Sequence, residues 1–486
     1  MGHVRHPHQL FIGGRWVDPA AGGRASLISP ETEAIVADVA DGTSADIDRA
    51  VLAARAAFDS GPWPTMSVER RLELLAQFAE KLRARHADFQ AVEQMQIGAT
   101  RRFARAHTVW GTEHVDDAVA LGRTFPFEDR RSGPDGTSIV VCEPVGVVAA
   151  IAPWNAPYML MSRKVAPALL AGCTVVMKPA AETPFEAYIM AECAEDVGLP
   201  PGVLNLVTGG RDVGDHLVCN PGIDKVAFTG STTAGRRIAS VCADRVARCQ
   251  LELGGKSAAI VLDDITVDEA ARILAHSVTL HTGQICRALT RAIVPRHRHN
   301  ELAEAIRQEM ALIRVGPPSD PETMMGPLAS RAQLERVDAA VKQGLAEGAK
   351  LVCGGGRPKG MNHGYYFEPT LFAEVNNSMS IAQEEIFGPV LCLIPCKDTD
   401  DAVRIANDSK YGLNGSVLSH DKDEVYRISR QVRSGLMGQN GMRTNFSLPF
   451  GGFKQSGIGR EGGPDGLMEY LELKAIMFDD AGILPA

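Results

Sequence analysis

Between residues 145 and 242, short apolar runs rich in β-branched residues alternate with longer segments whose apolar residues recur at helical spacing. The short runs predict strands at 145–151, 174–177, 203–207 and 225–228, and the longer segments predict helices at 162–170, 184–197, 213–219 and 233–242. Strands that alternate with helices of this length indicate βαβ crossovers and a mainly parallel sheet. The first half of the chain is therefore a candidate nucleotide-binding domain.

A second alternation begins near residue 256. A strand pattern at 257–262 is followed by helical patterns at 267–280 and 299–313, which together predict a second α/β domain. Upstream, the segments 45–58 and 68–85 have apolar residues at helical spacing and predict helices that flank the first sheet. Two more strand patterns, at 137–142 and 469–478, lie at the domain edges.

Size and charge restrict the class of protein. A chain of 486 residues is long enough for a large buried core and about three domains. The formal net charge of −9 argues against a nucleic-acid partner, because an acidic protein without a concentrated basic face repels phosphates. We find no apolar run typical of a signal peptide or a membrane span, so the sequence predicts a cytoplasmic protein without membrane contact.

The cysteines bear on metal binding and disulfides. The chain has 10 of them, without CxxC pairs or paired histidines, so neither a metal site nor a disulfide framework is expected.

Three short motifs carry candidate chemistry. Cys286 lies in Gly283-Gln284-Ile285-Cys286-Arg287, downstream of Glu252 in Glu252-Leu253-Gly254-Gly255-Lys256. A soft nucleophile and a separately delivered carboxylate are the two groups needed to form and then hydrolyse a thioester. Asn155, in Pro153-Trp154-Asn155, can supply an amide donor for a developing oxyanion. Together the three motifs predict aldehyde oxidation.

These motifs, with several others, carry a resemblance to a known family. The other motifs are Lys178-Pro179, Phe228-Thr229-Gly230-Ser231, Glu385-Ile386-Phe387-Gly388-Pro389 and Pro449-Phe450-Gly451-Gly452-Phe453-Lys454. The chain resembles the NAD(P)-dependent aldehyde dehydrogenase superfamily from about residue 11 to about residue 478, in family order and spacing.

The resemblance implies an α/β, aldehyde dehydrogenase-like fold. A Rossmann-type dinucleotide-binding domain is expected at 1–124 and 146–255, a second α/β catalytic domain at 256–455, and a small β oligomerisation segment at 125–145 and 456–486. It also implies a homodimer or homotetramer.

The resemblance further assigns roles to single residues. Cys286 is the expected nucleophile, Asn155 the oxyanion donor and Glu252 the general base, while Lys164 matches a lysine near the oxyanion loop. The expected cofactor contacts are Trp154, Lys178, Ala181, Gly230, Ser231, Gly254, Glu385 and Phe387. NAD is the expected cofactor. NADP stays open, because Ala181 stands where NAD-preferring relatives often have an acidic residue.

The glycine-rich turns differ in their sequence context. The turn at 228–235 ends a predicted strand and begins a predicted helix, which suits a dinucleotide phosphate; the alternative is an ordinary turn capped by Ser231. Residues 457–462 match GxGxxG, but they lack the strand before and the helix after that the motif requires, so we predict a loop there.

Two residues bear on which aldehyde is the substrate. Relatives that oxidise semialdehydes have an arginine at the position of Arg163, so this residue is a candidate ligand for a distal carboxylate; the alternative is a solvated helix residue. Tyr158 is a second candidate substrate contact. A coenzyme A-acylating or phosphorylating dehydrogenase and a catalytically inactive structural homologue are the alternative functions.

Overall fold

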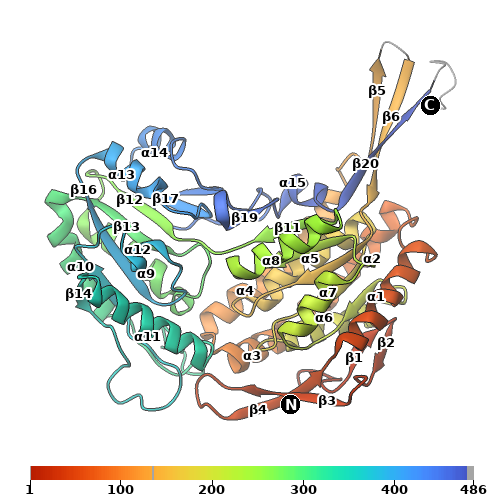
Figure 1. Ribbon diagram of the computed structural model, residues 1–486, viewed down its shortest axis with the longest axis horizontal. Helices are drawn as coiled ribbons and strands as arrows, with labels where there is room; N and C mark the ends of the chain where they lie inside the picture. Colours follow the sequence, from red (N-terminus) through yellow and green to blue (C-terminus); the bar gives the residue numbers. More distant parts are fainter. Residues whose placement is uncertain (1, 134–135, 479–486) are drawn as a thin grey trace.

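The computed structural model describes residues 2–133 and 136–478. Two α/β lobes lie side by side, and a β flap extends from the first lobe away from the rest of the molecule (Figure 1). Within the described residues, we find no helix with the length and apolarity needed to cross a membrane.

The first lobe contains an eight-stranded sheet with the order β19-β11-β10-β7-β8-β9-β1-β2. Its strands are β1 (Leu10–Ile12), β2 (Arg15–Val17), β7 (Val147–Ile151), β8 (Thr174–Lys178), β9 (Leu204–Leu206), β10 (Lys225–Thr229), β11 (Arg248–Glu252) and β19 (Gly457–Ile458). The strands from β11 to β9 pair in parallel, as the alternating pattern predicted. β19 pairs antiparallel with β11, although its residues fall in the range assigned to the oligomerisation segment.

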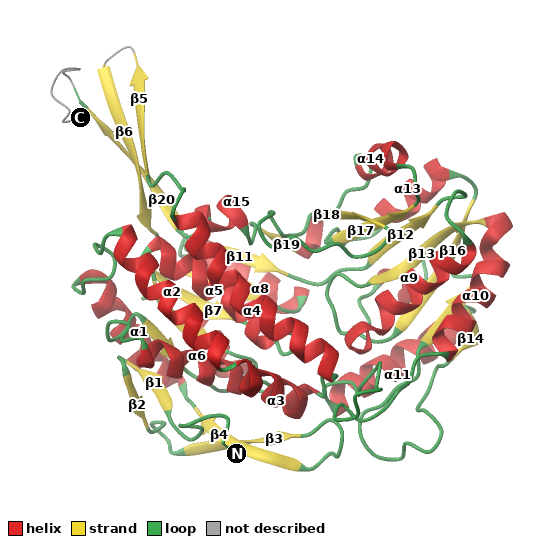
Figure 2. Cartoon of the chain, turned by 180° about the vertical axis from the view of Figure 1, so that it is seen from behind, coloured by secondary structure: helices red, strands yellow, loops and turns green. Residues whose placement is uncertain are grey.

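Helices cover both faces of this sheet (Figures 1 and 2). They are α1 (Ser44–Asp59), α2 (Val68–Ala84), α3 (His86–Ile97), α4 (Arg101–Gly122), α5 (Pro157–Ala171), α6 (Phe185–Asp196), α7 (Arg211–Cys219) and α8 (Thr232–Asp244). α5 begins at Pro157, earlier than predicted, because proline is well tolerated in the first turn of a helix. This earlier start places residues 158–163 on a helix directly after Asn155.

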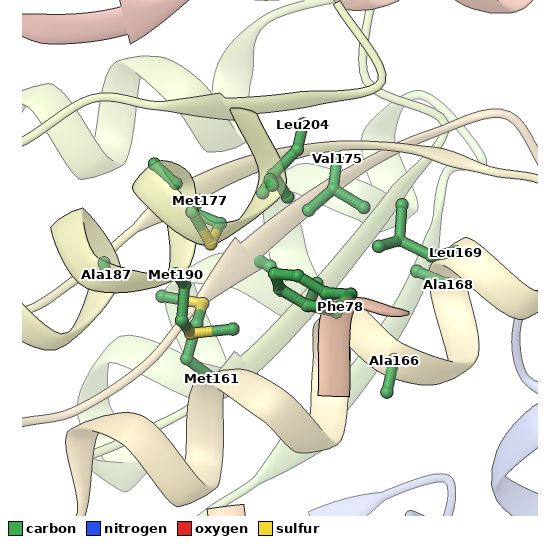
Figure 3. Close-up of a cluster of buried hydrophobic side chains, with 14 of the residues drawn as sticks. Phe78, Met161, Ala166, Ala168, Leu169, Val175, Met177, Ala187, Met190 and Leu204 are labelled. Atoms are coloured by element: carbon green, nitrogen blue, oxygen red, sulfur yellow. The ribbon is translucent and has the colours of Figure 1, made fainter. Parts of the chain in front are cut away.

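The core of the first lobe lies between α2, α5 and α6 and the sheet. Figure 3 shows Phe78 of α2 among Leu169 of α5, Val175 and Met177 of β8 and Met190 of α6. All five side chains are fully buried. Full burial of one such side chain contributes about 1.5–3 kcal/mol, so this packing fixes α5 against β8.

The second lobe contains a seven-stranded sheet with the order β14-β15-β16-β13-β12-β17-β18. Its strands are β12 (Ser257–Val261), β13 (Leu289–Pro295), β14 (Lys350–Cys353), β15 (Thr370–Ala373), β16 (Val390–Cys396), β17 (Asn414–Leu418) and β18 (Leu436–Gln439). Its helices are α9 (Val267–Thr279), α10 (His299–Ala311), α11 (Arg331–Ala346), α12 (Ser380–Gln383), α13 (Thr399–Asn407) and α14 (Lys422–Ser429). Every pairing is parallel except that of the edge strand β14.

The flap is a three-stranded antiparallel sheet of β20 (Leu471–Met477), β6 (Gly136–Pro144) and β5 (Glu128–Gly133). The two strand patterns at the domain edges therefore pair with each other. Residues 134–135 and 479–486 of the predicted oligomerisation segment lie outside the described residues. A separate hairpin of β3 (Gly23–Ile28) and β4 (Ile35–Asp41) lies below the first lobe (Figure 1). The short helix α15 (Gly463–Met468) follows the GxGxxG segment at 457–462.

Candidate active site

The turn before Cys286 is tightly constrained. A short 3-10 helix at Leu280–Gly283 precedes it, and within that helix His281 and Thr282 have positive φ angles of 48° and 57°. Gly283 also has a positive φ, and a Cβ there would lie 2.1 Å from the carbonyl oxygen of Gly388. Non-glycine residues keep such a conformation only where the surrounding structure holds it, and such strain is frequent at functional sites. The turn thus fixes the backbone that carries the Cys286 thiol.

Asn155 is bonded to the same turn. It follows β7, and its Nδ2 donates a hydrogen bond of 2.9 Å to the backbone carbonyl oxygen of Gln284. Asn155 and Cys286 line one tunnel. The apolar part of its wall comprises Phe103, Trp110, Met159, Leu436, Phe446 and Phe450. A nucleophile and an amide donor therefore face one largely apolar space.

The Cys286 thiol is protonated in this environment. Burial raises its pKa to about 12, and the nearby carboxyl groups of Glu385 and Glu252 act in the same direction. The guanidinium groups of Arg287 and Arg163 oppose this effect and lower the pKa. The thiolate, which is the nucleophilic form, therefore depends on positive charge near the sulfur.

Glu252 is the last residue of β11, and its side chain is buried. Within the described residues, neither carboxyl oxygen has a hydrogen-bond partner. A Cβ on Gly451 would lie 2.8 Å from Oε1, so the carboxyl group is close to that loop. Burial, and then Glu461, raises the pKa of Glu252 well above its usual range, while Arg163 and Lys164 partly oppose the shift. This environment therefore favours the protonated form of Glu252, which can act as a base only after it loses its proton.

Lys164 and Glu461 form a buried ion pair. The Nζ of Lys164 donates to Oε1 of Glu461 and to Oγ1 of Thr229, both at 2.6 Å. Burial acts to raise the pKa of Glu461, but Lys164 and Arg163 outweigh it and hold this pKa below the usual value. Lys164 thus neutralises a carboxylate near Glu252.

Arg163 is part of the tunnel wall. Its guanidinium lies 4.3 Å from the centre of the Phe450 ring, and its Nε lies 3.5 Å from Oε2 of Glu461. Nε and Nη2 are buried without a hydrogen-bond partner among the described residues. The solvated-helix alternative is therefore excluded, because this side chain is buried at the tunnel.

The turn between β10 and α8 has the features of a phosphate site. Ser231 caps α8 by accepting a hydrogen bond of 3.3 Å from the backbone N–H of Ala234. Since the first four N–H groups of a helix have no partner within it, others in this turn remain for an anion. The backbone N–H of Gly230 donates to the carbonyl oxygen of Glu252 at 3.0 Å. The turn is thus joined to the strand that carries Glu252.

Lys178 ends β8 at the same edge of the sheet. Burial lowers its pKa to about 8, and its Nζ donates to the carbonyl oxygen of Pro179 at 2.9 Å. Ala181 is exposed in the turn that follows. Ligands collect at the carboxyl ends of parallel strands, so these residues fit one part of a dinucleotide.

A second group of expected cofactor contacts lies where the lobes meet. Glu385 accepts a hydrogen bond of 3.1 Å from the backbone N–H of Gly255, and burial raises its pKa to about 7. A Cβ on Gly254 would lie 2.3 Å from Oε2 of Glu385, so a larger residue there would displace this carboxyl group. The rings of Trp154 and Phe387 meet edge to face at 5.4 Å. The structure therefore brings this group of residues together.

Tyr158 is placed differently from what the sequence suggested. Its ring stacks on Phe89 at 3.8 Å, and its hydroxyl forms a hydrogen bond of 2.8 Å with Thr112. It therefore serves packing between α5 and its neighbouring helices. Phe103, His107 and Trp110 of α4 also line the tunnel, although no motif in the sequence indicated a functional role for this helix. Their spacing on one helical face was the available signal.

The first lobe has a parallel sheet with a turn suited to a phosphate. Next to it lies the tunnel, which is lined by a thiol and an amide. This is the arrangement of a thiol-dependent dehydrogenase. The sequence model of the aldehyde dehydrogenase family matches residues 16–476. A 3-succinoylsemialdehyde-pyridine dehydrogenase from Pseudomonas sp. is 43% identical over 478 residues, which cover 98% of this chain and 99% of that protein. The chain belongs to the aldehyde dehydrogenase family and is an oxidoreductase.

Solved structures agree with this assignment. An aldehyde dehydrogenase of Mycobacterium tuberculosis, complexed with NAD+, has 43% sequence identity and a TM-score of 0.96 over 98% of this chain and 99% of that one. A mutant of aldehyde dehydrogenase C from Pseudomonas syringae, complexed with NAD+ and octanal, has 42% identity and a TM-score of 0.95 over 99% of each chain. The predicted fold class is confirmed.

Proposed function

We propose that this enzyme oxidises an aldehyde to a carboxylic acid with NAD+ and water, through a thioester on Cys286. The observation that carries the proposal is that Cys286 and Asn155 line one tunnel while Asn155 is bonded to the turn before Cys286. The family assignment and the NAD+ complexes of the similar structures support it.

The first half of the reaction uses the tunnel groups. The Cys286 thiol gives its proton to water, the thiolate sulfur attacks the carbonyl carbon, and the carbonyl oxygen takes up the negative charge. The Nδ2 of Asn155 and the backbone N–H of Cys286 donate to that oxygen. Loss of one such donor typically lowers the rate by about 10²–10³-fold. Arg287 aids the attack because its charge favours the thiolate.

The cofactor site follows from residues at both lobes. Lys178, Gly230 and Ser231 suit the adenosine and phosphate part, and Glu385, Phe387 and Trp154 suit the nicotinamide part. When bound there, NAD+ supplies the hydride acceptor. We propose NAD+ rather than NADP+ because the similar structures hold NAD+. Ala181 provides no carboxylate that would repel a 2′-phosphate, so NADP+ is the comparison to test.

Glu252 acts in the second half. After it loses its proton, it removes a proton from a water molecule, and the resulting hydroxide attacks the thioester carbonyl. The C–S bond then breaks, the carboxylic acid leaves, and the sulfur returns as the thiolate. A buried carboxyl group without a fixed hydrogen-bond partner is suited to this role, because it can turn toward the reacting carbon.

Two further expectations belong to this proposal. The exposed apolar residues Leu473 and Met477 on β20 support a homodimer or homotetramer formed through the flap. A cytoplasmic location also remains our expectation.

The test measures reduced nicotinamide by absorbance with NAD+ and NADP+, against short, long, aromatic and acid-bearing aldehydes. We expect acid release without coenzyme A or phosphate, loss of activity in Cys286→Ala, and strong loss in Glu252→Gln. A strict requirement for coenzyme A or phosphate would identify the acylating alternative instead. Absence of reduced nicotinamide with every aldehyde would identify an inactive homologue.

A second candidate is a semialdehyde-specific dehydrogenase. Arg163 supports it, because this buried guanidinium lines the tunnel and, among the described residues, its Nε and Nη2 have no hydrogen-bond partner beyond the 3.5 Å ion pair of Nε with Glu461. We expect Arg163→Met to lower kcat/KM for succinate semialdehyde by at least about tenfold more than for hexanal. An unchanged ratio of the two kcat/KM values would exclude this role.

A further inference from the structure

A buried acid–imidazole pair lies at the tunnel wall. Glu93 of α3 and His107 of α4 approach each other with Oε1 and Nδ1 at 3.2 Å. Their side chains are only 5% and 8% exposed. The His107 ring lines the tunnel, between Phe103 at 3.7 Å and Trp110 at 5.4 Å. The pair therefore connects the helical layer of the first lobe with the space next to Cys286.

The surroundings of the pair favour an overall neutral state. Burial raises the pKa of Glu93 well above its usual range and lowers the pKa of His107 to about 3. A second buried carboxyl, Glu186, accepts a hydrogen bond of 2.8 Å from Gln96, and burial raises its pKa to about 8. Glu93 thus lies near another acid and has no buried cation as a hydrogen-bond partner among the described residues.

The neutral pair contains two protons, and their positions decide what His107 offers to the tunnel. If the Glu93 hydroxyl donates to Nδ1, the second proton is on Nε2. Transfer of the acid proton to Nδ1 also leaves a proton on Nε2. In the remaining arrangement, Nδ1–H donates to the acid and Nε2 carries no proton. The Glu93 hydroxyl group then has no hydrogen-bond acceptor in a buried site, which costs about 1–3 kcal/mol. The pair therefore favours Nε2–H as a hydrogen-bond donor.

The charged residues of the tunnel lining are also hydrogen-bond donors. Arg163, Arg287 and Arg443 contribute to its described lining, whereas no aspartate or glutamate does. Such a wall supplies donors and positive charge, and it has few acceptors. This wall suits a ligand group that accepts hydrogen bonds. A wholly apolar wall would not distinguish such a group from a methylene group.

We propose that His107, oriented by Glu93, is a specificity-determining residue that donates a hydrogen bond from Nε2 to an acceptor on the remote part of the aldehyde. The substrate class is an aldehyde with a second, uncharged acceptor, such as a ketone oxygen or a ring nitrogen. Glu93 is the positioning residue, because it acts only through His107. This inference rests on the proposed oxidation at Cys286.

The experiment compares substrates of nearly equal shape: hexanal with 5-oxohexanal, and benzaldehyde with the three pyridine carbaldehydes. The readout is the ratio of kcat/KM for the acceptor-bearing and the plain aldehyde, so intrinsic reactivity cancels between enzymes. In His107→Phe we expect this ratio to fall by about tenfold or more for at least one pair, because a buried acceptor loses its donor. Turnover of hexanal and benzaldehyde should fall less than that of the acceptor-bearing aldehydes, because the ring is replaced by one of similar size.

A matched control is His114→Phe. His114 is another buried histidine of α4, but it packs against Phe446 at 4.4 Å and is not part of the tunnel lining. We expect its substrate ratios to equal those of the wild type. If His107→Phe fails to fold, His107→Leu carries the same expectation.

Variants of Glu93 separate orientation from packing. Glu93→Gln retains an N–H that can donate to Nδ1, so the wild-type ratio should be kept. Glu93→Leu removes the orienting group, and the ratio should fall mainly through a higher KM for the acceptor-bearing aldehyde. Unchanged substrate ratios in both variants would mean that Glu93 only packs and does not orient the ring.

The outcomes also distinguish this inference from the proposed function. Unchanged ratios in His107→Phe, in an enzyme that still oxidises hexanal, would overturn the inference and leave the oxidation intact. Failure of the wild type to oxidise any aldehyde would overturn the proposed function itself. A loss for succinate semialdehyde in Arg163→Met but not in His107→Phe would show that charged acceptors are bound separately.

Discussion

The ammonium group of Lys164 donates a hydrogen bond of 2.6 Å to Glu461 and thereby keeps a carboxylate charged inside the protein, close to Glu252. The two acids influence each other, and their environments push their pKa values in opposite directions. Glu461, held by Lys164, has a lowered pKa, whereas Glu252 has a raised one. The site thus favours the ionised form of Glu461 and the protonated form of Glu252.

This relationship predicts the pH dependence of thioester hydrolysis. Because the pKa of Glu252 is raised, its basic form is scarce at and below the usual carboxyl range and increases as the pH rises. The hydrolysis rate should therefore increase with pH through this raised pKa. In Glu461→Gln, the loss of a neighbouring negative charge should move the rise to lower pH. The measurement is the pH profile of the slow phase after a rapid first turnover.

Asn155→Ala should lower kcat/KM by about 10²–10³-fold, because the developing oxyanion loses one of two donors. Asn155 also bonds to the turn before Cys286, so part of the loss can arise from a displaced nucleophile. Asn445→Ala, which removes another amide from the tunnel wall, is the matched control and should cost far less. Similar losses in the two variants would contradict the oxyanion role. Steady-state kinetics with thermal unfolding curves separate chemistry from stability.

Arg287 should control the reactivity of the Cys286 thiol. Its guanidinium donates to the carbonyl oxygen of Arg443 at 3.0 Å and to Oγ1 of Thr444 at 2.6 Å, and this fixes a positive charge next to the sulfur. Arg287 is partly exposed, so water screens its charge. At the dielectric constant of water, removal of one charge at a few ångströms changes the thiol pKa by about half a unit to one unit. In Arg287→Gln, alkylation by iodoacetamide at pH 8 should therefore slow by roughly 3- to 10-fold.

The control for Arg287 is Arg443→Gln, since Arg443 lines the tunnel but has no part in the shifted pKa of Cys286. Alkylation of Cys286 is followed by mass spectrometry of its peptide, because Cys219 is exposed and can react as well. Recovery in Arg287→Lys would assign the effect to charge. An unchanged alkylation rate in Arg287→Gln would mean that Arg287 only holds the loop at 443–444.

The parallel sheets could be predicted from the sequence because strands buried on both faces are continuous apolar runs, as in β7 and β8. The strand β19 could not be predicted from the sequence, because its two residues form a strand only through their pairing with β11. The start of α5 was placed too late because the segment at 157–161 carries a proline, which usually marks a break and here occupies the first turn.

The candidate site could be proposed from the sequence where a local motif carries the chemistry, as for Cys286, Glu252 and Asn155, whose catalytic roles stay predictions. It was not predictable where orientation depends on contacts between distant helices. Tyr158 turns toward Phe89 and Arg163 toward the tunnel, although both are on α5. The Glu93–His107 pair likewise forms only when α3 packs against α4. Sequence spacing does not determine such contacts.

The two halves of the proposed reaction should separate in Glu252→Gln. Attack by Cys286 and hydride loss do not need the carboxylate, so one equivalent of reduced nicotinamide per active site should still form rapidly. The following turnovers should be slower than in the wild type by about 10²–10⁴-fold, because water loses its general base. Stopped-flow absorbance measures the burst and the slow phase, and mass spectrometry of quenched enzyme should find the acyl group on the Cys286 peptide. Cys286→Ala, which retains Glu252, should show no burst. If the burst disappears in Glu252→Gln together with the turnover, then Glu252 acts before the thioester forms, and its assignment to hydrolysis is wrong.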